Sequence, residues 1–160
     1  MEEAPAFETR IDKPGSILFM CGQNSIRSPM AEVIAKRLLP PDIYIQSAGV
    51  KAGEPDHFVD TVLQEIGLAL PRHQPRTLEE LEDDYFDVIV TLAPEAHHFA
   101  LELTRSQPVE VIYWPLIDPT AVGGDSREQI LDAYRAVRDQ LWRQIEARFA
   151  TPISHRIQKV

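Results

Sequence analysis

Short apolar runs alternate along the chain with longer stretches whose apolar residues recur every three or four positions. Each run is bounded by polar or turn-forming residues, which is typical of a buried strand. The runs occupy 17–20, 43–49, 86–92 and 109–114. The stretches with helical spacing occupy 29–39, 56–66, 94–103 and 125–149. This alternation predicts an α/β fold, with one parallel sheet and helices on both of its faces.

Capping preferences indicate where three of these helices begin or end. Ser28 is a favourable N-cap, and Pro29 suits the first helical position because its missing N–H costs nothing there. Asp125 and Glu128 have the spacing of a capping box at the start of the last helix. Gly67 is expected to close the second helix.

Length and charge fit one globular domain and narrow the range of partners. The 160 residues are 44% hydrophobic and 26% charged, and we expect one domain over 16–150 between a flexible lead-in, 1–15, and a tail, 151–160. The net charge of −9 disfavours nucleic acid or an anionic membrane as the main partner. No apolar run reaches the roughly 20 residues that cross a bilayer. The first residues lack the apolar core of a secretory signal, so a cytoplasmic location is expected.

The sequence favours chemistry without a cofactor or a metal. Cys21 is the only cysteine, which excludes an internal disulfide and a cysteine-based metal cluster. His97 and His98 are adjacent and would point in different directions on a helix, so they do not form a paired metal site. Neither common glycine-rich nucleotide motif occurs. The sequence carries no signal for an oligomeric state.

The stretch from Cys21 to Ser28 carries the clearest chemistry. Cys21 follows a strand, and five residues lead to Arg27 near a helix start, where backbone N–H groups and the helix dipole attract anions. Such surroundings stabilise a nucleophilic thiolate, and Arg27 can fork two hydrogen bonds onto a phosphate. Asn24 tolerates the left-handed conformation that such a loop needs, and the Ser28 hydroxyl can stabilise the sulfur. The expected phosphate-binding residues are Gly22, Gln23, Asn24, Ser25, Ile26, Arg27 and Ser28.

Two plainer interpretations stand beside this one. An isolated cysteine is more often an inert buried thiol, but the loop, the arginine, the serine and the proline together favour a nucleophile. A phosphoester leaving group needs a general acid, and Asp118, before Pro119 in a loop beyond the fourth strand, is placed to supply it. An Asp-Pro pair also initiates ordinary turns, so both interpretations of Asp118 stay open.

The chain resembles the low-molecular-weight protein tyrosine phosphatases over about residues 16 to 149. In that family a strand runs into a cysteine, five residues and then Arg-Ser-Pro-Met-Ala-Glu, as it does here through 27–32. The resemblance implies a flavodoxin-like, open four-stranded parallel sheet of strand order 2-1-3-4. It also implies a phosphocysteine intermediate, with Cys21 as nucleophile, Arg27 as phosphate clamp and Asp118 as general acid and then base. The implied substrate is a phosphotyrosine protein or a small phosphoester.

Further segments fall in the family's order. They are Ser47-Ala48-Gly49, His73-x-x-Arg76 and Asp118-Pro119. The resemblance implies that Asn24, Ser28, Ser47 and His73 form the hydrogen-bond network that shapes the loop.

Three features depart from the family pattern. Ile26 replaces a second cysteine, so Cys21 has no neighbour for a protective disulfide. Gly22 and Gln23 stand where the family more often has a bulky residue and then glycine, so a wider pocket wall is expected. Thr120 and Ala121 stand where aromatic residues often follow the Asp-Pro pair. An aryl substrate would therefore lose a stacking partner.

Two other functions remain open. Trp114 to Pro119 resembles the acid loop of the related arsenate reductases, but the single cysteine means that this activity would require an external thiol. A non-catalytic phosphate-binding module would keep Arg27 and the loop without using a nucleophile. The presence of Cys21, Arg27 and Asp118 together argues against that third interpretation.

Overall fold

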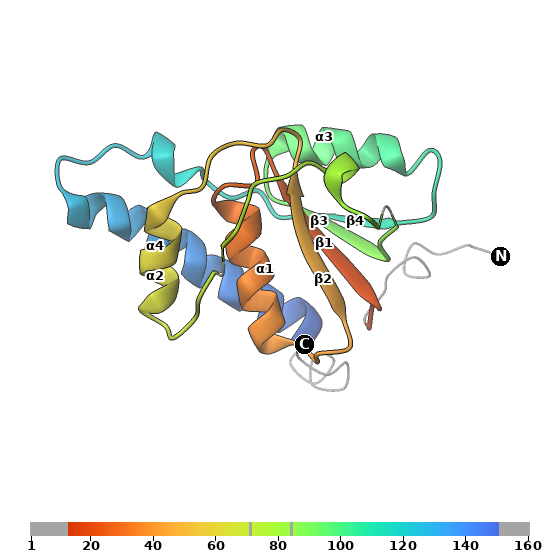
Figure 1. Cartoon of the computed structure of the whole chain (residues 1–160), viewed down its shortest axis with the longest axis horizontal. Helices are drawn as coiled ribbons and strands as arrows, with labels where there is room; N and C mark the ends of the chain where they lie inside the picture. Colours follow the sequence, from red (N-terminus) through yellow and green to blue (C-terminus); the bar gives the residue numbers. More distant parts are fainter. Residues whose placement is uncertain (1–12, 71, 84, 151–160) are drawn as a thin grey trace, which may run out of the picture.

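The computed structural model describes residues 13–70, 72–83 and 85–150, so most of the expected lead-in and the whole expected tail lie outside the described residues. Four strands form one parallel sheet in the order β2-β1-β3-β4 (Figure 1). They are Ser16–Cys21 (β1), Tyr44–Gly49 (β2), Val88–Thr91 (β3) and Glu110–Tyr113 (β4). The predicted architecture and strand order are confirmed.

The central strands are apolar because both of their faces are covered. All four residues of β3 are buried, as are Ile17 through Cys21 of β1. Such continuous apolar runs are typical of parallel strands that lie between two layers of helices. In the edge strand β4 the first three residues are only partly buried and the last, Tyr113, is exposed.

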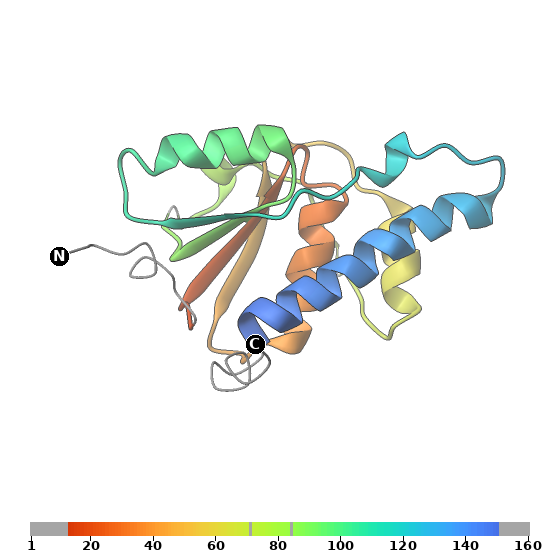
Figure 2. The same ribbon diagram turned by 180° about the vertical axis from the view of Figure 1, so that it is seen from behind.

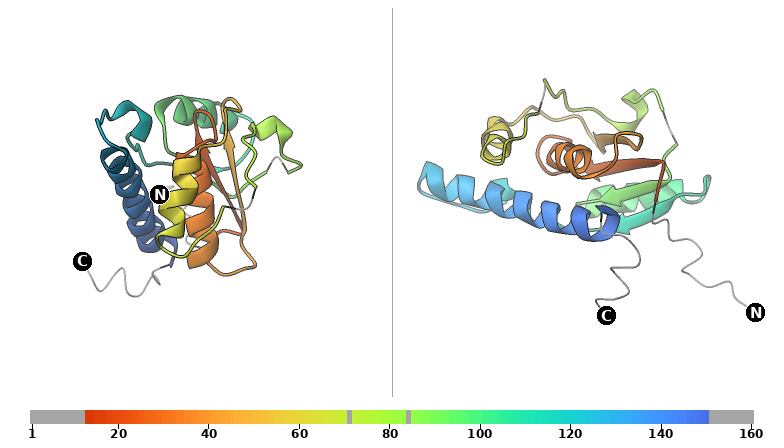
Figure 3. Two further views of the ribbon diagram at one scale, coloured as in Figure 1. Left: turned by 60° about the vertical axis from the view of Figure 1, so that its left-hand side comes forward. Right: turned by 90° about the horizontal axis from the view of Figure 1, so that it is seen from below.

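Helices cover both faces of the sheet. The connection from β1 to β2 steps in the opposite direction from that between β3 and β4, so right-handed crossovers place Arg27–Leu38 (α1) and Pro94–Leu103 (α3) on opposite faces. The long helix Arg127–Ile145 (α4) packs beside α1, as Figures 2 and 3 show. None of the helices in the described ranges is long and apolar enough to span a membrane.

Two expected helix starts are wrong by one or two residues. The N-cap of α1 is Ile26, which makes no side-chain cap, and Ser28 lies inside the helix because its hydroxyl is used in the loop. In α4 the capping box is formed by Ser126 and Gln129, one residue beyond the expected pair. A serine hydroxyl reaches the backbone N–H of the third helical residue as well as an aspartate does.

Shorter helical segments complete the fold. They are His57–Gln64 (α2), Leu78–Glu80 (η2), Pro119–Ala121 (η3) and Glu146–Ala150 (η4). Helix α2 begins at the N-cap Asp56, and Gly67 beyond its end has a φ of 76°, as expected for a closing glycine.

Ionic contacts fasten α2 to α4. Glu65 receives hydrogen bonds from Arg135 Nη2 at 2.7 Å and from Arg138 Nη1 at 2.8 Å. Arg138 Nη1 also donates to the carbonyl of Val62 at 2.9 Å. Hydrogen bonds from Arg135, together with those from Arg138, lower the pKa of Glu65 from 4.5 to about 2.

The lowered pKa of Glu65 predicts a pH-dependent contribution to stability. A carboxyl group with a depressed pKa in the folded state stabilises the fold fully above pH 4.5 and loses this contribution as the pH falls toward 2. Glu65→Gln should therefore lower Tm clearly at pH 7 and less at about pH 3.5, measured by circular dichroism. Glu128→Gln, which removes a more exposed partner of Arg135, is the control and should change Tm less. Equal decreases for Glu65→Gln at both pH values would contradict this role.

Candidate active site

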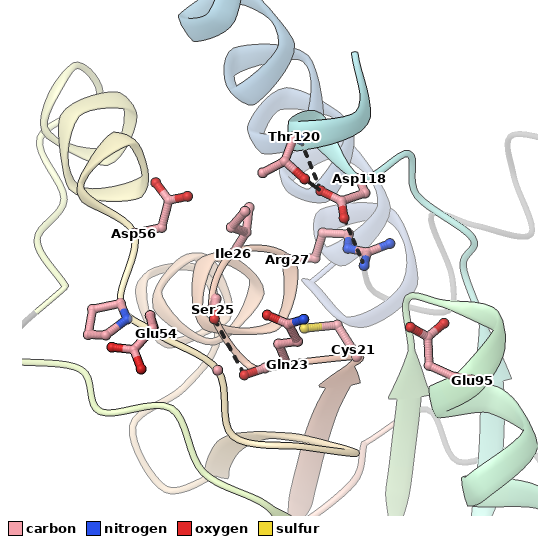
Figure 4. Close-up of a pocket in the computed structure, with 13 residues that line it drawn as sticks. Cys21, Gln23, Ser25, Ile26, Arg27, Glu54, Asp56, Glu95, Asp118 and Thr120 are labelled. Atoms are coloured by element: carbon pink, nitrogen blue, oxygen red, sulfur yellow. Dashed lines mark hydrogen bonds and ion pairs between the residues drawn. The ribbon is translucent and has the colours of Figure 1, made fainter. Parts of the chain in front are cut away.

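The predicted phosphate-binding loop lies at the carboxyl end of β1. This end is next to the point where the strand order reverses, between β1 and β3, and such points are the usual ligand sites of open α/β sheets. The chain leaves β1 at Cys21, turns, and enters α1 at Arg27. Figure 4 shows Cys21 at the strand end, below the side chain of Arg27. The N-terminus of α1 is therefore directed at the space above the sulfur.

A neighbouring segment packs closely against the first half of the loop. Backbone N–H groups of Val50, Lys51 and Gly53 donate to carbonyls of the loop, at 2.9 to 3.2 Å. A Cβ on Gly49 would lie 2.7 Å from the backbone nitrogen of Asn24. Only glycine at position 49 lets the two segments approach this closely.

Asn24 is the residue on which the loop is built. Its φ is 55°, in the left-handed region, as the sequence predicts. Its side-chain Nδ2 donates to Ser28 Oγ at 2.9 Å and to Ser47 Oγ at 3.0 Å, and its Oδ1 accepts from the backbone N–H of Arg76 at 3.0 Å. Asn24 is fully buried, so its amide contacts are shielded from water.

A second set of residues holds the partners of Asn24. The Ser47 hydroxyl donates a hydrogen bond to Glu32 Oε1 at 2.6 Å. Lys36 Nζ donates to the other oxygen, Glu32 Oε2, at 2.6 Å, and Arg76 Nη2 lies 3.6 Å from Oε1. Arg76 Nε donates to the carbonyl of Ser47 at 3.1 Å. Glu32 is a carboxylate in a largely buried position, and these partners satisfy its charge.

His73 holds the backbone of Asn24 in place. Its Nε2 lies 2.8 Å from the carbonyl oxygen of Asn24, which can only accept, so Nε2 carries the proton and donates. Burial lowers the pKa of His73 below its usual value of 6.5. A neutral imidazole with its proton on Nε2 therefore supports the loop at neutral pH.

The network ends at the sulfur. Cys21 Sγ lies 3.0 Å from Ser28 Oγ, and Ser28 Oγ already accepts a hydrogen bond from Asn24. The one proton of the Ser28 hydroxyl is therefore left for Sγ or for the carbonyl of Ala48, which is farther away at 3.4 Å. A thiolate at Cys21 would receive this proton as a hydrogen bond.

Arg27 and Asp118 meet across the mouth of the pocket. Arg27 Nη1 donates to the carbonyl of Leu116 at 3.1 Å, and Nη2 lies 4.0 Å from Asp118 Oδ2. Asp118 Oδ1 accepts from both the backbone N–H and the hydroxyl of Thr120, at 2.9 and 2.7 Å. Since Oδ1 is occupied by two donors, Oδ2 is the oxygen available for proton transfer. The Asp118 side chain is 43% exposed, so it is open to solvent.

The pocket above Cys21 is open and has a volume of about 370 Å³. Three carboxylates line it that the sequence analysis did not single out: Glu54, Asp56 and Glu95. A Cβ on Gly22 would lie 2.5 Å from Glu95 Oε2, so this carboxylate rests against the loop (Figure 4). Glu95 could have been found, because it lies in the first turn of the helix after β3, the strand next to β1.

The predicted site residues come together, with different degrees of access to the pocket. The pocket is lined by Cys21, Gly22, Gln23, Ser25, Ile26, Arg27 and Asp118. Asn24, Ser28 and Ser47 lie beneath it, fully buried, and His73 supports the loop from the side. Among the described residues, no group of three or more histidine, cysteine or acidic side chains could hold a metal ion.

Comparison with known proteins finds one matching family and relatives that cover most of this chain. Residues 16–151 match the family described as low molecular weight phosphotyrosine protein phosphatase. A glutaredoxin arsenate reductase from Synechocystis is 27% identical over 130 residues, 81% of this chain and 92% of that one. A protein-arginine-phosphatase from Geobacillus stearothermophilus is 30% identical over 141 residues, 80% of this chain and 89% of that one. The crystal structure of the Erwinia amylovora tyrosine phosphatase amsI superposes with a TM-score of 0.67 and 25% identity, covering 83% of this chain and 89% of that one.

The contacts of Asn24 predict how the loop binds an anion. Asn24→Gly keeps access to the left-handed backbone conformation but loses the three side-chain hydrogen bonds. Asn24→Ala loses the same hydrogen bonds and also disfavours the left-handed conformation. Both variants should bind inorganic phosphate at least roughly tenfold more weakly by calorimetry, with Asn24→Ala the weaker. Gln64→Ala, which removes an exposed amide on α2, is the control and should bind normally. Unchanged affinity in Asn24→Gly would show that the amide contacts are not needed.

Proposed function

Since the chain belongs to the low molecular weight phosphotyrosine protein phosphatase family, we propose that it hydrolyses phosphomonoesters through a phosphocysteine intermediate on Cys21. Its substrate is then a phosphotyrosine protein or a small phosphoester. The observation that carries this proposal is the placement of Cys21, Arg27 and Asp118 around one pocket, with Ser28 within 3.0 Å of the sulfur.

In the first step, Cys21 Sγ attacks phosphorus and the bond from phosphorus to the ester oxygen breaks. The leaving oxygen takes a proton from Asp118, for which Oδ2 is the available atom. The loop N–H groups and Arg27 stabilise the charge on the three remaining phosphoryl oxygens. Arg27 has four N–H donors left for this purpose after its contact with Leu116.

In the second step, Asp118, now a carboxylate, takes a proton from a water molecule. The water oxygen attacks phosphorus, and the bond between phosphorus and sulfur breaks with its electron pair remaining on Cys21. The Ser28 hydroxyl stabilises the departing thiolate, which makes the sulfur a better leaving group. Inorganic phosphate leaves the pocket and the starting state returns.

Arsenate reduction by means of an external thiol is the second candidate function. The observation in its favour is the name of the Synechocystis relative, a glutaredoxin arsenate reductase. Arsenate has the shape and charge of phosphate, so Cys21 would attack arsenic with loss of water. An external thiol would then attack Cys21 Sγ, and the electron pair of the sulfur–arsenic bond would reduce arsenic from +5 to +3. The mixed disulfide has to form with an external thiol, because the sequence contains one cysteine.

One paired assay separates the two functions. The purified protein is given an aryl phosphate, and separately arsenate with glutathione and glutaredoxin or with thioredoxin. We expect phosphate release that Cys21→Ser lowers by at least ~10³-fold, and no thiol-dependent arsenite. Arsenite formation without phosphate release would reverse the assignment. Phosphate binding without either activity would indicate a non-catalytic binding module.

The role of Asp118 predicts a dependence on the leaving group. A general acid matters most when the departing oxygen is a strong base, so Asp118→Ala should lower kcat/KM roughly 100-fold or more for phenyl phosphate. The loss should be much smaller for 2,4-dinitrophenyl phosphate, whose phenolate leaves without a proton. An equal loss for both substrates would exclude Asp118 as the acid of the first step.

A further inference from the structure

A second pocket lies behind the phosphate-binding loop. Its volume is about 680 Å³, larger than the 370 Å³ of the pocket above Cys21. It lies between the exposed side of α1 and residues 67–70 and 72–76 of the connection from α2 to η2, which Figure 1 shows running alongside α1. The lining residues are Glu32, Val33, Lys36, Arg37, Gln46, Gly67, Leu68, Ala69, Leu70, Arg72, His73, Gln74 and Arg76.

The charge of this pocket is opposite to that of the chain. Four cationic side chains line it against the single carboxylate of Glu32, whereas the protein as a whole has a net charge of −9. The Glu32 carboxylate is already bound by Ser47, Lys36 and Arg76. Within the described ranges, the side chains of Arg37 and Arg72, both exposed residues, have neither an ion pair nor a hydrogen bond. Two guanidinium groups are thus free to bind an anion.

Part of the remaining wall is apolar, and the backbone of one cation, Arg72, has an unusual conformation. Val33, Leu68, Ala69 and Leu70 offer a surface for an organic group beside the charges. The backbone of Arg72 has a φ of 36°, in the left-handed region, which is unfavourable for an arginine. Such conformations gather at binding sites, because they hold a side chain where an unstrained backbone would not.

The pocket also touches the supports of the loop. His73 and Arg76 line it, and both hold Asn24, His73 through the carbonyl and Arg76 through the side-chain Oδ1. A smaller hollow, lined by Ser25, Asp56 and His73 among others, lies between the two pockets and shares residues with each. An anion in the second pocket would therefore lie beside His73 and Arg76, the two residues that hold Asn24 of the loop.

We propose that this pocket is a second anion-binding site that takes the phosphate group of a small organic phosphate. Arg37 and Arg72 bind the phosphate oxygens, and Val33, Leu68 and Leu70 contact the organic part. A volume of about 680 Å³ lies within the roughly 300–1,000 Å³ usual for small-molecule sites. The site is separate from the pocket above Cys21 and does not depend on what reaction occurs there.

The test is a titration with phenylphosphonate, which has a phosphate-like group and a ring and cannot be hydrolysed. Amide chemical shifts in ¹⁵N–¹H NMR report the two sites separately, through residues 22–28 for the loop and 67–70 and 72–74 for the second pocket. We expect both sets to shift and to saturate independently. In Arg37→Gln/Arg72→Gln, affinity at the second set should fall at least about tenfold while the loop set titrates as before.

Two controls sharpen the result. Arg105→Gln/Arg143→Gln removes the same charge from exposed positions elsewhere and should leave both titrations unchanged. Inorganic phosphate should bind the second set more weakly than phenylphosphonate, because it lacks the ring. The proposal is overturned if only the loop amides shift, if potassium chloride at equal ionic strength gives the same shifts, or if the double variant keeps its affinity. Equal affinity for the two probes would overturn the organic part of the proposal.

Discussion

The buried amide of Asn24 is the contact on which the site depends. It holds a non-glycine residue in the left-handed conformation, with a φ of 55°, in the middle of a loop that must bend its backbone around an anion. The left-handed conformation is costly for most residues, but asparagine visits it more readily than others. Contacts from β2, from α1 and from the segment before η2 converge on this one side chain. The loop is therefore fixed by the tertiary fold and not by its own sequence alone.

The same network connects the sulfur to distant charges. From Cys21 the hydrogen bonds run through Ser28 and Asn24 to Ser47, and from there to the largely buried Glu32. Each hydroxyl accepts from Asn24, so its own proton is directed onward, toward sulfur in one branch and toward Glu32 in the other. Positive potential above the sulfur comes from backbone N–H groups and Arg27, in a pocket otherwise rimmed by carboxylates. The anion is thus recognised by a few fixed donors and not by a broadly basic surface.

The sequence was enough to predict the sheet, its strand order and the family, and all three are confirmed. The sheet follows from local periodicity and the family from a contiguous motif, whereas the strand order is what the resemblance to that family implies. The cap of α1 was wrong because Ser28 has two possible uses, and only the fold shows that its hydroxyl points to Cys21. Glu32 and Arg76 lie in segments that resemble the family, yet their roles were missed, because they act through partners far away in sequence. The three further carboxylates of the pocket come from two segments far apart in the sequence, Glu54 and Asp56 before α2 and Glu95 in the first turn of α3, which no local pattern connects.

The account rests on a nucleophilic sulfur at position 21 beneath a bound anion, and the alkylation of that thiol tests it most directly. Because the chain contains one cysteine, the mass added by iodoacetamide reports Cys21 alone. We expect Cys21 to react faster than N-acetylcysteine at about pH 6, and inorganic phosphate to slow the reaction strongly. A rate that follows N-acetylcysteine at every pH, with no protection by phosphate, would contradict the account.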